Sequence, residues 1–305
     1  MSDETQRTTV GPLPSGIGQQ VPSTPAALTR AVWLLWGLSL VALVGHAATG
    51  WAPALGDLVA VDGLTVLMWT VVSFFSGIVH SYSRRYMAGS NHETRFFATV
   101  FGFTLVVMGL VAANHIALFG VLWLAMGLLM ARLIGVISGW KQAGAAAAVA
   151  RKYFVASSAL LAVALTLLWG TTGATTISGI AADSATLGGT VWLAAAGALV
   201  LAAMIQSALI PFQGWLLSSM TAPTPASALM HAGFVNAGGV LLVRFAPVIT
   251  ADSWTMLAVV FVGTESALGG KFLKTVQTDV KGRLGCSTVG QMGFMIVQAG
   301  LGFFG

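Results

Sequence analysis

Apolar residues dominate nine segments of the chain, and short polar connections separate them. The segments lie at about 30–49, 60–80, 95–114, 116–138, 153–172, 190–210, 226–247, 253–273 and 287–304. Each is close to the ~20 residues that an α-helix needs to cross the hydrocarbon core of a bilayer. The pattern predicts an all-α, polytopic membrane protein with about nine transmembrane helices.

Lysine and arginine residues fall in alternate connections, and the connections in between contain none. The basic set is Arg7, Arg30, Arg84, Arg85, Arg95, Lys141, Arg151, Lys152, Lys274, Lys281 and Arg283. Because Lys and Arg are enriched on the cytoplasmic side of membrane proteins, we place the N-terminus in the cytoplasm. Residues 1–27, rich in Ser, Thr, Pro and Gly, are predicted to be a disordered cytoplasmic tail, and residues 28–305 a membrane domain. The stretch at 140–154 predicts a short interfacial helix that leads into the fifth span.

A polar stretch interrupts the apolar pattern between the sixth and seventh segments. It reads QSALIPFQGWLLSSMTAPTPASALMHAGFV, from Gln206 to Val235. Pro211 predicts the end or a break of the preceding helix, since proline lacks a backbone N–H. Broken helices of this kind form transport sites in membrane proteins, and Gln206 is then expected to line the break. The alternative is a simple turn at the inner surface, with Pro223 and Pro225 opening the next helix.

Ionisable side chains inside the apolar segments are few, and burying each of them in a bilayer is costly. Glu265 is a candidate proton or cation relay, or half of a structural ion pair. Lys271 is a second candidate for the ion pathway, or its long side chain reaches the inner surface. His231 is a candidate proton carrier, because imidazole titrates near physiological pH, or a hydrogen-bonded residue at a helix contact.

The two arginines inside spans are expected to be structural, since an arginine stays charged and is a poor proton carrier. Arg132 is predicted to pair with an acid or to reach the inner surface. Arg244, near the outer end of its span, is predicted to extend into the outer interface.

Composition narrows the class further. With 56% hydrophobic and 8% charged residues, the chain cannot hide its apolar surface as a soluble domain of 305 residues. One cysteine, Cys286, and five scattered histidines give no disulfide framework and no recognisable zinc site, so no cofactor is expected in this chain. The basic residues are spread between spans, so we expect the chain to contact a lipid bilayer and not a nucleic acid.

Four motifs then resemble one family, the proton-conducting antiporter-like subunits of respiratory complex I and of Mrp-type antiporters. They are RRYMAGSNHETRFFATVFGF, LFGVLWLAMGLLMARLIG, QSALIPFQGWLLSSMTAPTPASALMHAG and VQTDVKGRLGCSTVGQMGFM, in the family's order. The resemblance covers about residue 60 to the end of the sequence.

The resemblance implies two inverted repeats of five helices, each with one discontinuous helix. The first repeat would be about 95–247, with its break near Pro211, and the second would start at about 253–305 and be cut short. The family's following block, which carries a histidine and a lysine, is absent, so residue 305 is either a natural end or a truncation.

Departures from the family pattern bear on the subfamily. The family's buried glutamate corresponds to Leu124, and its broken-helix lysine corresponds to Gln206. His231 and Lys281 match the pattern, while Glu265 and Lys271 are additional. The expected ion pathway is therefore His231, Glu265, Lys271 and Lys281, with Gln206 at the break.

These departures favour one branch, the membrane subunit of DAB-type inorganic-carbon transporters. The branch implies a cation-conducting (proton or sodium), energy-coupling subunit of a bacterial CO2/bicarbonate transport complex in the cell inner membrane. Its partner would be a large carbonic-anhydrase-like zinc subunit of the DabA type, which would hold the zinc and the catalysis. The alternatives are a proton-pumping NADH dehydrogenase subunit, an Mrp-type sodium/proton antiporter subunit and a non-conducting assembly subunit.

Overall fold

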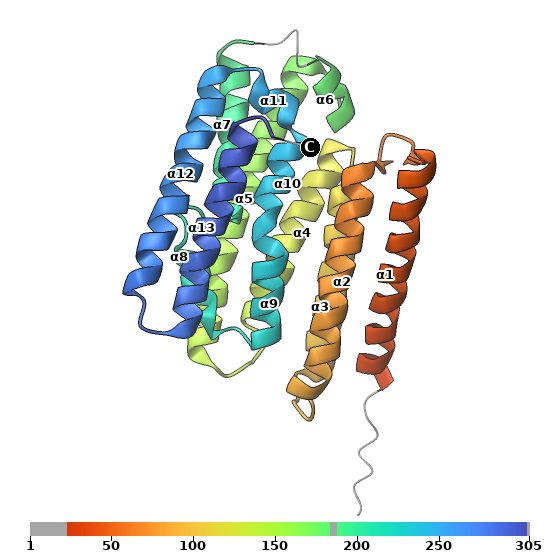
Figure 1. Ribbon diagram of the computed structural model, residues 1–305, viewed down its shortest axis with the longest axis vertical. Coiled ribbons are helices and arrows are strands. Elements are labelled where there is room, and N and C mark those ends of the chain that lie inside the picture. Colours follow the sequence, from red (N-terminus) through yellow and green to blue (C-terminus); the bar gives the residue numbers. More distant parts are fainter. Residues whose placement is uncertain (1–22, 184–187, 304–305) are drawn as a thin grey trace, which may run out of the picture.

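The computed structural model describes residues 23–183 and 188–303, and the described chain is a bundle of long helices (Figure 1). The α-helices are α1 (Ser23–Thr49), α2 (Gly63–Tyr86), α3 (Glu93–Ala112), α4 (Ile116–Ile134), α5 (Lys141–Thr172), α6 (Ile177–Asp183), α7 (Thr190–Gln206), α8 (Gly214–Ser218), α9 (Thr224–Ala232), α10 (Ala237–Arg244), α11 (Ala246–Thr250), α12 (Ser253–Val276) and α13 (Val280–Gly300). Two 3-10 turns, η2 (Ser219–Thr221) and η3 (Phe234–Asn236), and a small antiparallel hairpin, β1 (Ala54–Leu55) with β2 (Val59–Ala60), complete the described elements.

The prediction of an all-α polytopic membrane protein is confirmed. Seven helical runs in the described chain are long and apolar enough to cross a membrane: α1 to α5, α12 and the run from α9 through α10. Helix α7 is equally apolar but has 17 residues. Helix α13 has 21 residues and carries basic residues in its first turn. Each predicted apolar segment therefore corresponds to a helical region, and the seventh is divided between α9 and α10.

Two boundaries differ from the predictions. Helix α1 begins at Ser23, so residues 23–27 are its first turns, and the rest of the predicted tail lies outside the described residues. The expected interfacial helix at 140–154 is wrong, because Lys141–Thr172 is one continuous helix of 32 residues. Its alanine-rich start has high helix propensity and lacks proline, so nothing in it ends the helix before the span.

The basic residues gather at one end of the bundle. Figure 1 shows the start of α1 and the α2–α3, α4–α5 and α12–α13 connections at the lower end, which we call the basic end. The β1–β2 hairpin and the α3–α4 turn lie at the opposite end.

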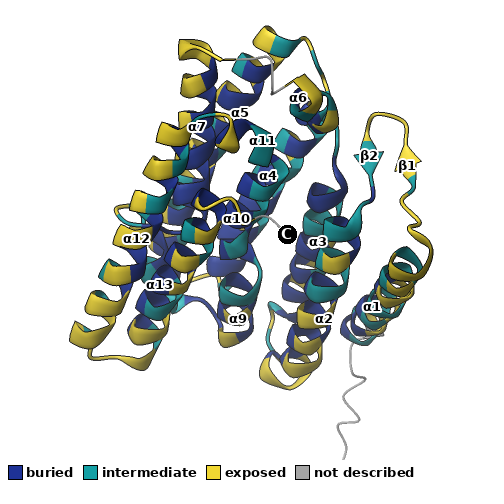
Figure 2. Cartoon of the chain, turned by 45° about the horizontal axis from the view of Figure 1, so that its top comes forward, coloured by how far each residue is buried: buried dark blue, intermediate teal, exposed yellow. Residues whose placement is uncertain are grey.

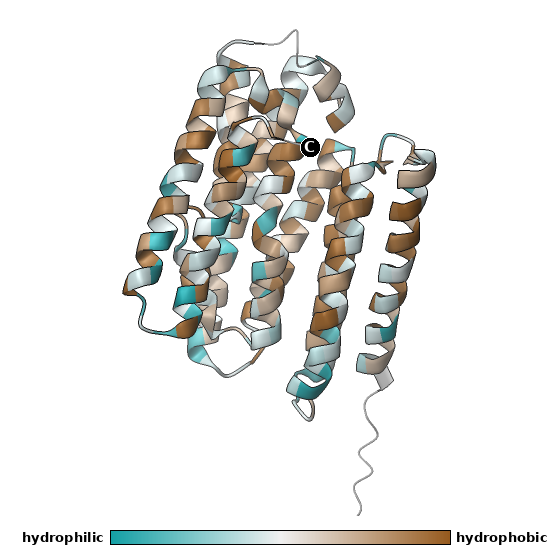
Figure 3. Cartoon of the chain, viewed as in Figure 1, coloured by the Kyte–Doolittle hydropathy of each residue, from teal (hydrophilic) through white to brown (hydrophobic). Residues whose placement is uncertain are grey.

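Burial divides the helices into a centre and an outer shell. Figure 2 shows buried residues on the facing sides of α4, α5 and α10, and exposed residues on the outward faces of α12 and α1. Figure 3 shows hydrophobic residues along the outward faces of α1 and α12. Exposed large apolar side chains include Val41, Phe261 and Phe272. In a membrane such faces contact lipid or further helices at no hydrophobic cost.

An aromatic cluster in the centre fixes the helices around the polar stretch. Phe154 of α5, Trp215 of α8 and Phe234 of η3 meet edge to face, with ring centroids 4.7–5.7 Å apart. All three side chains are fully buried. Gly127 of α4 lies against Phe154, where a Cβ atom would be 2.8 Å from the Phe154 Cβ.

Candidate functional site

The predicted discontinuity near Pro211 is present in the structure. Helix α7 ends at Gln206, helix α8 begins at Gly214, and residues 207–213 between them are not helical. The Ile210–Pro211 peptide bond is cis, and Ala208 has a left-handed φ of 53°. The local cause is proline, which cannot continue the helical hydrogen-bond ladder.

Hydrogen bonds tie the unwound segment and its flanks to neighbouring elements. The Ile210 N–H donates to Ser266 Oγ of α12 at 3.1 Å. The Ser207 hydroxyl donates to the Val235 carbonyl at 2.6 Å, and the Trp215 indole N–H donates to the Ile205 carbonyl at 2.9 Å. Unwound backbone at membrane depth requires such protein partners, so the break is a built feature of the bundle.

Gln206, at the edge of the break, carries polar atoms that are unpaired within the described chain, as does Gln213 within the break at its Oε1. The Gln206 side chain is fully buried, and neither its Oε1 nor its Nε2 has a hydrogen-bond partner among the described residues. Leaving such a group unpaired costs about 1–3 kcal/mol. An amide held there offers one acceptor and two donors to a water molecule or a hydrated cation, so the predicted position of Gln206 at the break is chemically suited to an ion path.

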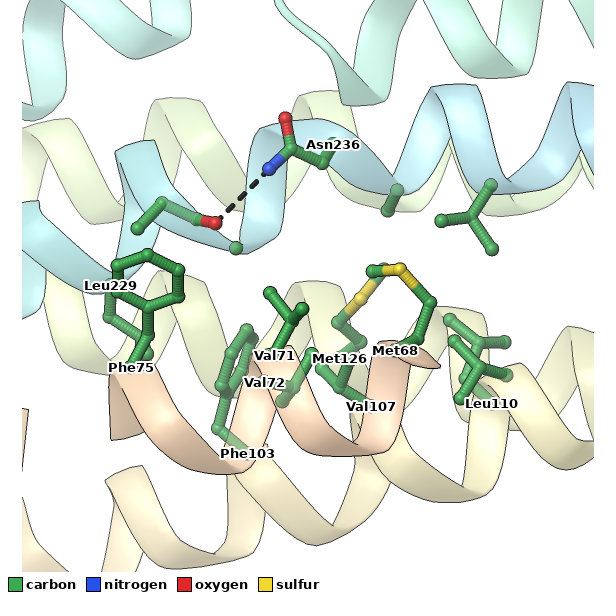
Figure 4. Close-up of a pocket in the computed structure, with 15 residues that line it drawn as sticks. Met68, Val71, Val72, Phe75, Phe103, Val107, Leu110, Met126, Leu229 and Asn236 are labelled. Atoms are coloured by element: carbon green, nitrogen blue, oxygen red, sulfur yellow. Dashed lines mark hydrogen bonds between the residues drawn. The ribbon is translucent and has the colours of Figure 1, made fainter. Parts of the chain in front are cut away.

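A second break follows His231, and the sequence did not predict it. Helix α9 ends at Ala232, the chain turns through η3, and α10 begins at Ala237. Asn236 Nδ2 donates to the Ala232 carbonyl at 3.1 Å (Figure 4). The glycine at 233 and the asparagine at 236 were the available signals for this interruption. Figure 4 shows the residues around an apolar crevice of about 50 Å³ beside it.

His231 reaches α13 across the bundle. The half-buried ring places Nδ1 2.9 Å from the Thr288 hydroxyl oxygen. The Thr288 hydroxyl itself donates to the Leu284 carbonyl at 3.0 Å, so it accepts from the histidine when Nδ1 carries the proton. His231 is therefore a hydrogen-bonded residue at a helix contact, through Nδ1.

Lys281 binds backbone carbonyls of the α8–α9 connection. Its ammonium donates to the Met220 carbonyl at 3.1 Å and to the Ala222 carbonyl at 3.2 Å. These carbonyls belong to η2 and to the residue after it. Lys281 thus places a positive charge beside the α8–α9 connection, seven residues before the threonine that contacts His231 along α13.

Glu265 and Lys271 lie elsewhere, on the exposed side of α12. Lys271 Nζ sits 4.4 Å from the ring centroid of Phe294, a cation–π distance. Lys271, Lys274 and Arg283 line an open cavity of about 510 Å³ between α12 and α13. The structure brings His231 and Lys281 to the broken helices and does not bring Glu265 there.

Arg132 also faces outward, from the last turn of α4. In the described part of the chain Arg132 forms no ion pair. Its exposed side chain lies near the basic end of the bundle.

The expectation that Arg244 extends into the interface is wrong. Its guanidinium pairs with Asp62, donating to both carboxylate oxygens, and also donates to Thr65 Oγ1 at 2.6 Å and to the Val111 carbonyl. This is the one ion pair between described residues. Together with the hydrogen bonds to Thr65 and Val111, it joins α10 to the start of α2 and the end of α3. A guanidinium that is only 13% exposed needs such partners.

Asp62 is the residue that sequence reasoning missed. It caps α2 by accepting from the Thr65 N–H at 2.8 Å. Burial raises the pKa of its carboxyl, but hydrogen bonds from Arg244 and Thr65 outweigh burial and hold the pKa below its ordinary value. The signal was an aspartate placed three residues before a threonine at the start of an apolar run, an N-cap pattern.

The two interrupted spans, with polar side chains aimed at the interruptions, define the class of multi-pass membrane transport subunits. The chain belongs to the NADH:quinone oxidoreductase/Mrp antiporter family, whose transmembrane model matches residues 113–305. A second model, the N-terminus of NADH-ubiquinone oxidoreductase (complex I) chain 5, matches residues 58–97. The resemblance inferred from the four motifs is confirmed.

Relatives come from each branch of this family. A probable inorganic carbon transporter subunit, DabB1 of Halothiobacillus neapolitanus, is 37% identical over 94% of this chain and 53% of its own length. NADH-quinone oxidoreductase subunit L of Mycobacterium tuberculosis is 35% identical over 83% of this chain and 41% of its own length.

The fold has a solved counterpart in the structure of the Mrp complex from Dietzia sp., with a TM-score of 0.80 and 27% identity. That match covers 91% of this chain and 32% of the other. The chain spans about half the length of the curated inorganic carbon transporter subunits it matches.

Proposed function

We propose that this chain is the cation-conducting, energy-coupling membrane subunit of a bacterial inorganic-carbon transport complex. The observation that carries the proposal is the broken helix at residues 207–213, with the buried and unpaired Gln206 amide at its edge. The ion path runs past Gln206 and the His231–Thr288 pair. Lys281 belongs to the proposed pathway by holding the α8–α9 connection against α13 through the Met220 and Ala222 carbonyls.

Two missing charges favour the inorganic-carbon branch over a respiratory or Mrp-type role. Leu124 is a partly buried, uncharged residue where the family resemblance implies a glutamate, and Gln206 is uncharged where it implies a lysine. A relay that depends on moving charge between such a pair cannot operate here. The name of the relative DabB1 supports the same branch.

The coupling cation is proposed to be a proton or sodium, and the partner a large carbonic-anhydrase-like zinc subunit. The N-terminus is proposed to be cytoplasmic and the membrane to be the cell inner membrane, because the basic connections share one end of the bundle. Glu265 and Lys271 are proposed to act only where the cation enters the pathway, since both are exposed on α12.

Substitution of Gln206 tests the ion path. Gln206→Leu removes the unpaired amide at similar volume, so we expect cation flux in proteoliposomes to fall at least ~10-fold while thermal stability stays equal or rises. Gln298→Leu, on the exposed side of α13, is the matched control and should leave both unchanged. Unchanged flux in Gln206→Leu, with the control also unchanged, would exclude the break as the path.

The partner is tested separately. Affinity purification from native membranes, followed by mass spectrometry, should retain a large zinc-binding protein as the main companion. Retention of quinone-dehydrogenase or Mrp subunits would instead assign the chain to one of those complexes.

A further inference from the structure

A buried polar stripe lies on α2, outside the broken-helix region. Ser73, Ser76, His80 and Ser83 are spaced by three or four residues, so they share one face of the helix. Each of the four is at most 1% exposed. The face meets α3, because Ser76 Oγ lies 2.6 Å from Thr104 Oγ1 and the His80 ring lies edge to face with Phe97 at 5.6 Å.

Hydrogen bonds determine where the protons of this cluster lie. The Thr104 hydroxyl donates to the Val100 carbonyl at 2.9 Å, so Thr104 Oγ1 accepts from Ser76. His80 Nδ1 lies 2.8 Å from the Ser76 carbonyl, and a carbonyl can only accept. Nδ1 therefore carries the proton, and Ser76 Oγ, 3.3 Å from Nδ1, has its own hydrogen committed to Thr104.

One atom of the cluster is left open. In the neutral ring with a proton on Nδ1, Nε2 presents a lone pair. His80 Nε2 is buried and has no hydrogen-bond partner in the part of the chain that the structure describes.

No charged side chain already occupies this position. The helices packed on α2 are α1, α3 and α9. Their titratable and charged groups are Arg30 and His46 on α1, Glu93 and Arg95 on α3, and His231 on α9, with Tyr82, Arg84, Arg85 and Tyr86 on α2 itself. Arg244 of α10 reaches the first turn of α2 through Thr65. None of these forms a hydrogen bond or ion pair with His80 among the described residues.

We propose that His80 Nε2 is a proton-binding site in the interior of the α2–α3 interface, separate from the broken helices. The acquired proton makes an imidazolium whose Nδ1–H stays on the Ser76 carbonyl and whose new Nε2–H points away from it. Because the Ser76–Thr104–Val100 chain ends on a carbonyl, the cluster holds one proton and does not pass it along the stripe. The site is independent of whether the chain conducts cations at the break.

Nitrogen NMR of the bilayer-embedded protein with ¹⁵N-labelled histidine tests this assignment, and the His80→Gln variant identifies the signal by its loss. We expect His80 to show a protonated Nδ1 and a bare Nε2 at high pH, and to convert to the doubly protonated ring as the pH is lowered. His46 is the matched control, because its Nδ1 also contacts a backbone carbonyl, that of Trp51 at 2.7 Å, in a solvent-exposed setting. A proton on Nε2 with a bare Nδ1, or a ring that stays neutral until the protein unfolds, would overturn the proposal.

If the His80→Gln variant does not fold, deuterium exchange at the histidine C2–H, read by mass spectrometry on the unchanged protein, resolves each histidine without substitution. A titrating His80 that exchanges more slowly than His46 supports a buried proton site. An exchange rate at His80 that does not change with pH contradicts it.

Discussion

The Asp62–Arg244 pair leads to a quantitative prediction about what holds the N-terminal helices to the broken spans. Asp62→Ala removes two interactions, the cap of α2 and the ion pair with Arg244. Loss of an N-cap costs about 1 kcal/mol. Loss of hydrogen bonds to a charged group costs about 1.5–3 kcal/mol. The Asp62 side chain is 48% exposed, so water screens the pair and the lower value applies, for a total of about 2.5 kcal/mol.

The chain contains its own control for the cap. Asp252 caps α12 in the same way, accepting from the Thr255 N–H at 2.7 Å and from the Thr255 hydroxyl at 3.0 Å, and it has no arginine partner. Asp252→Ala should therefore cost about 1 kcal/mol. Asp62→Asn keeps a good cap and removes only the charge, so it should fall between the two alanine variants.

The assay uses the single cysteine. Cys286 is buried on α13, so a thiol-reactive fluorophore labels it only when the bundle opens, and a heating series gives a melting temperature for each variant. We expect Asp62→Ala to melt clearly below Asp252→Ala. Equal melting temperatures for the two would show that the ion pair contributes nothing and would refute the reasoning.

The same pair predicts a pH dependence. The pKa of Asp62 in the folded protein lies below its ordinary value of 3.8. The stabilisation from the ion pair is therefore fully present at neutral pH and is lost as the pH falls below 3.8 and through the lowered pKa. Asp62→Asn should lack this acid-side decline, and the melting series at decreasing pH measures it.

Three further predictions use the same melting assay. Gly263→Ala should destabilise the protein, because the added Cβ would lie 2.7 Å from a backbone nitrogen of α13. Gly197→Ala, with open space around the added Cβ, should instead stabilise it by up to ~1 kcal/mol through helix propensity. Stabilisation by both substitutions would contradict the close α12–α13 contact. Ser157→Ala should cost about 1–3 kcal/mol of stability, because it leaves the buried indole N–H of Trp123 on α4 unpaired. Ser158→Ala loses only a hydrogen bond within its own helix and should cost less than ~0.5 kcal/mol. Equal costs would contradict the role of Ser157 as the partner of Trp123. Lys281→Met should lower both the melting temperature and cation flux by freeing two carbonyls beside the broken helix, and normal flux in a folded variant would limit Lys281 to a structural role.

The sequence by itself determined the membrane class, the segments and the first helix break. These properties are local: an apolar run of sufficient length has one low-energy arrangement in lipid, and proline interrupts a helix wherever it stands. The break after His231 was missed because its signal, glycine with asparagine, permits an interruption without requiring one.

The tertiary structure alone decided which polar groups meet. Asp62 and Arg244 are 182 residues apart, and His231 meets Thr288 across 57 residues. Spans such as α7 are apolar on nearly every side, so their sequences do not state which face turns inward, and that rotation is set by packing against neighbouring helices. For this reason Glu265, a candidate relay in sequence, faces outward on α12, while His80, unremarked among scattered histidines, lies sealed between α2 and α3.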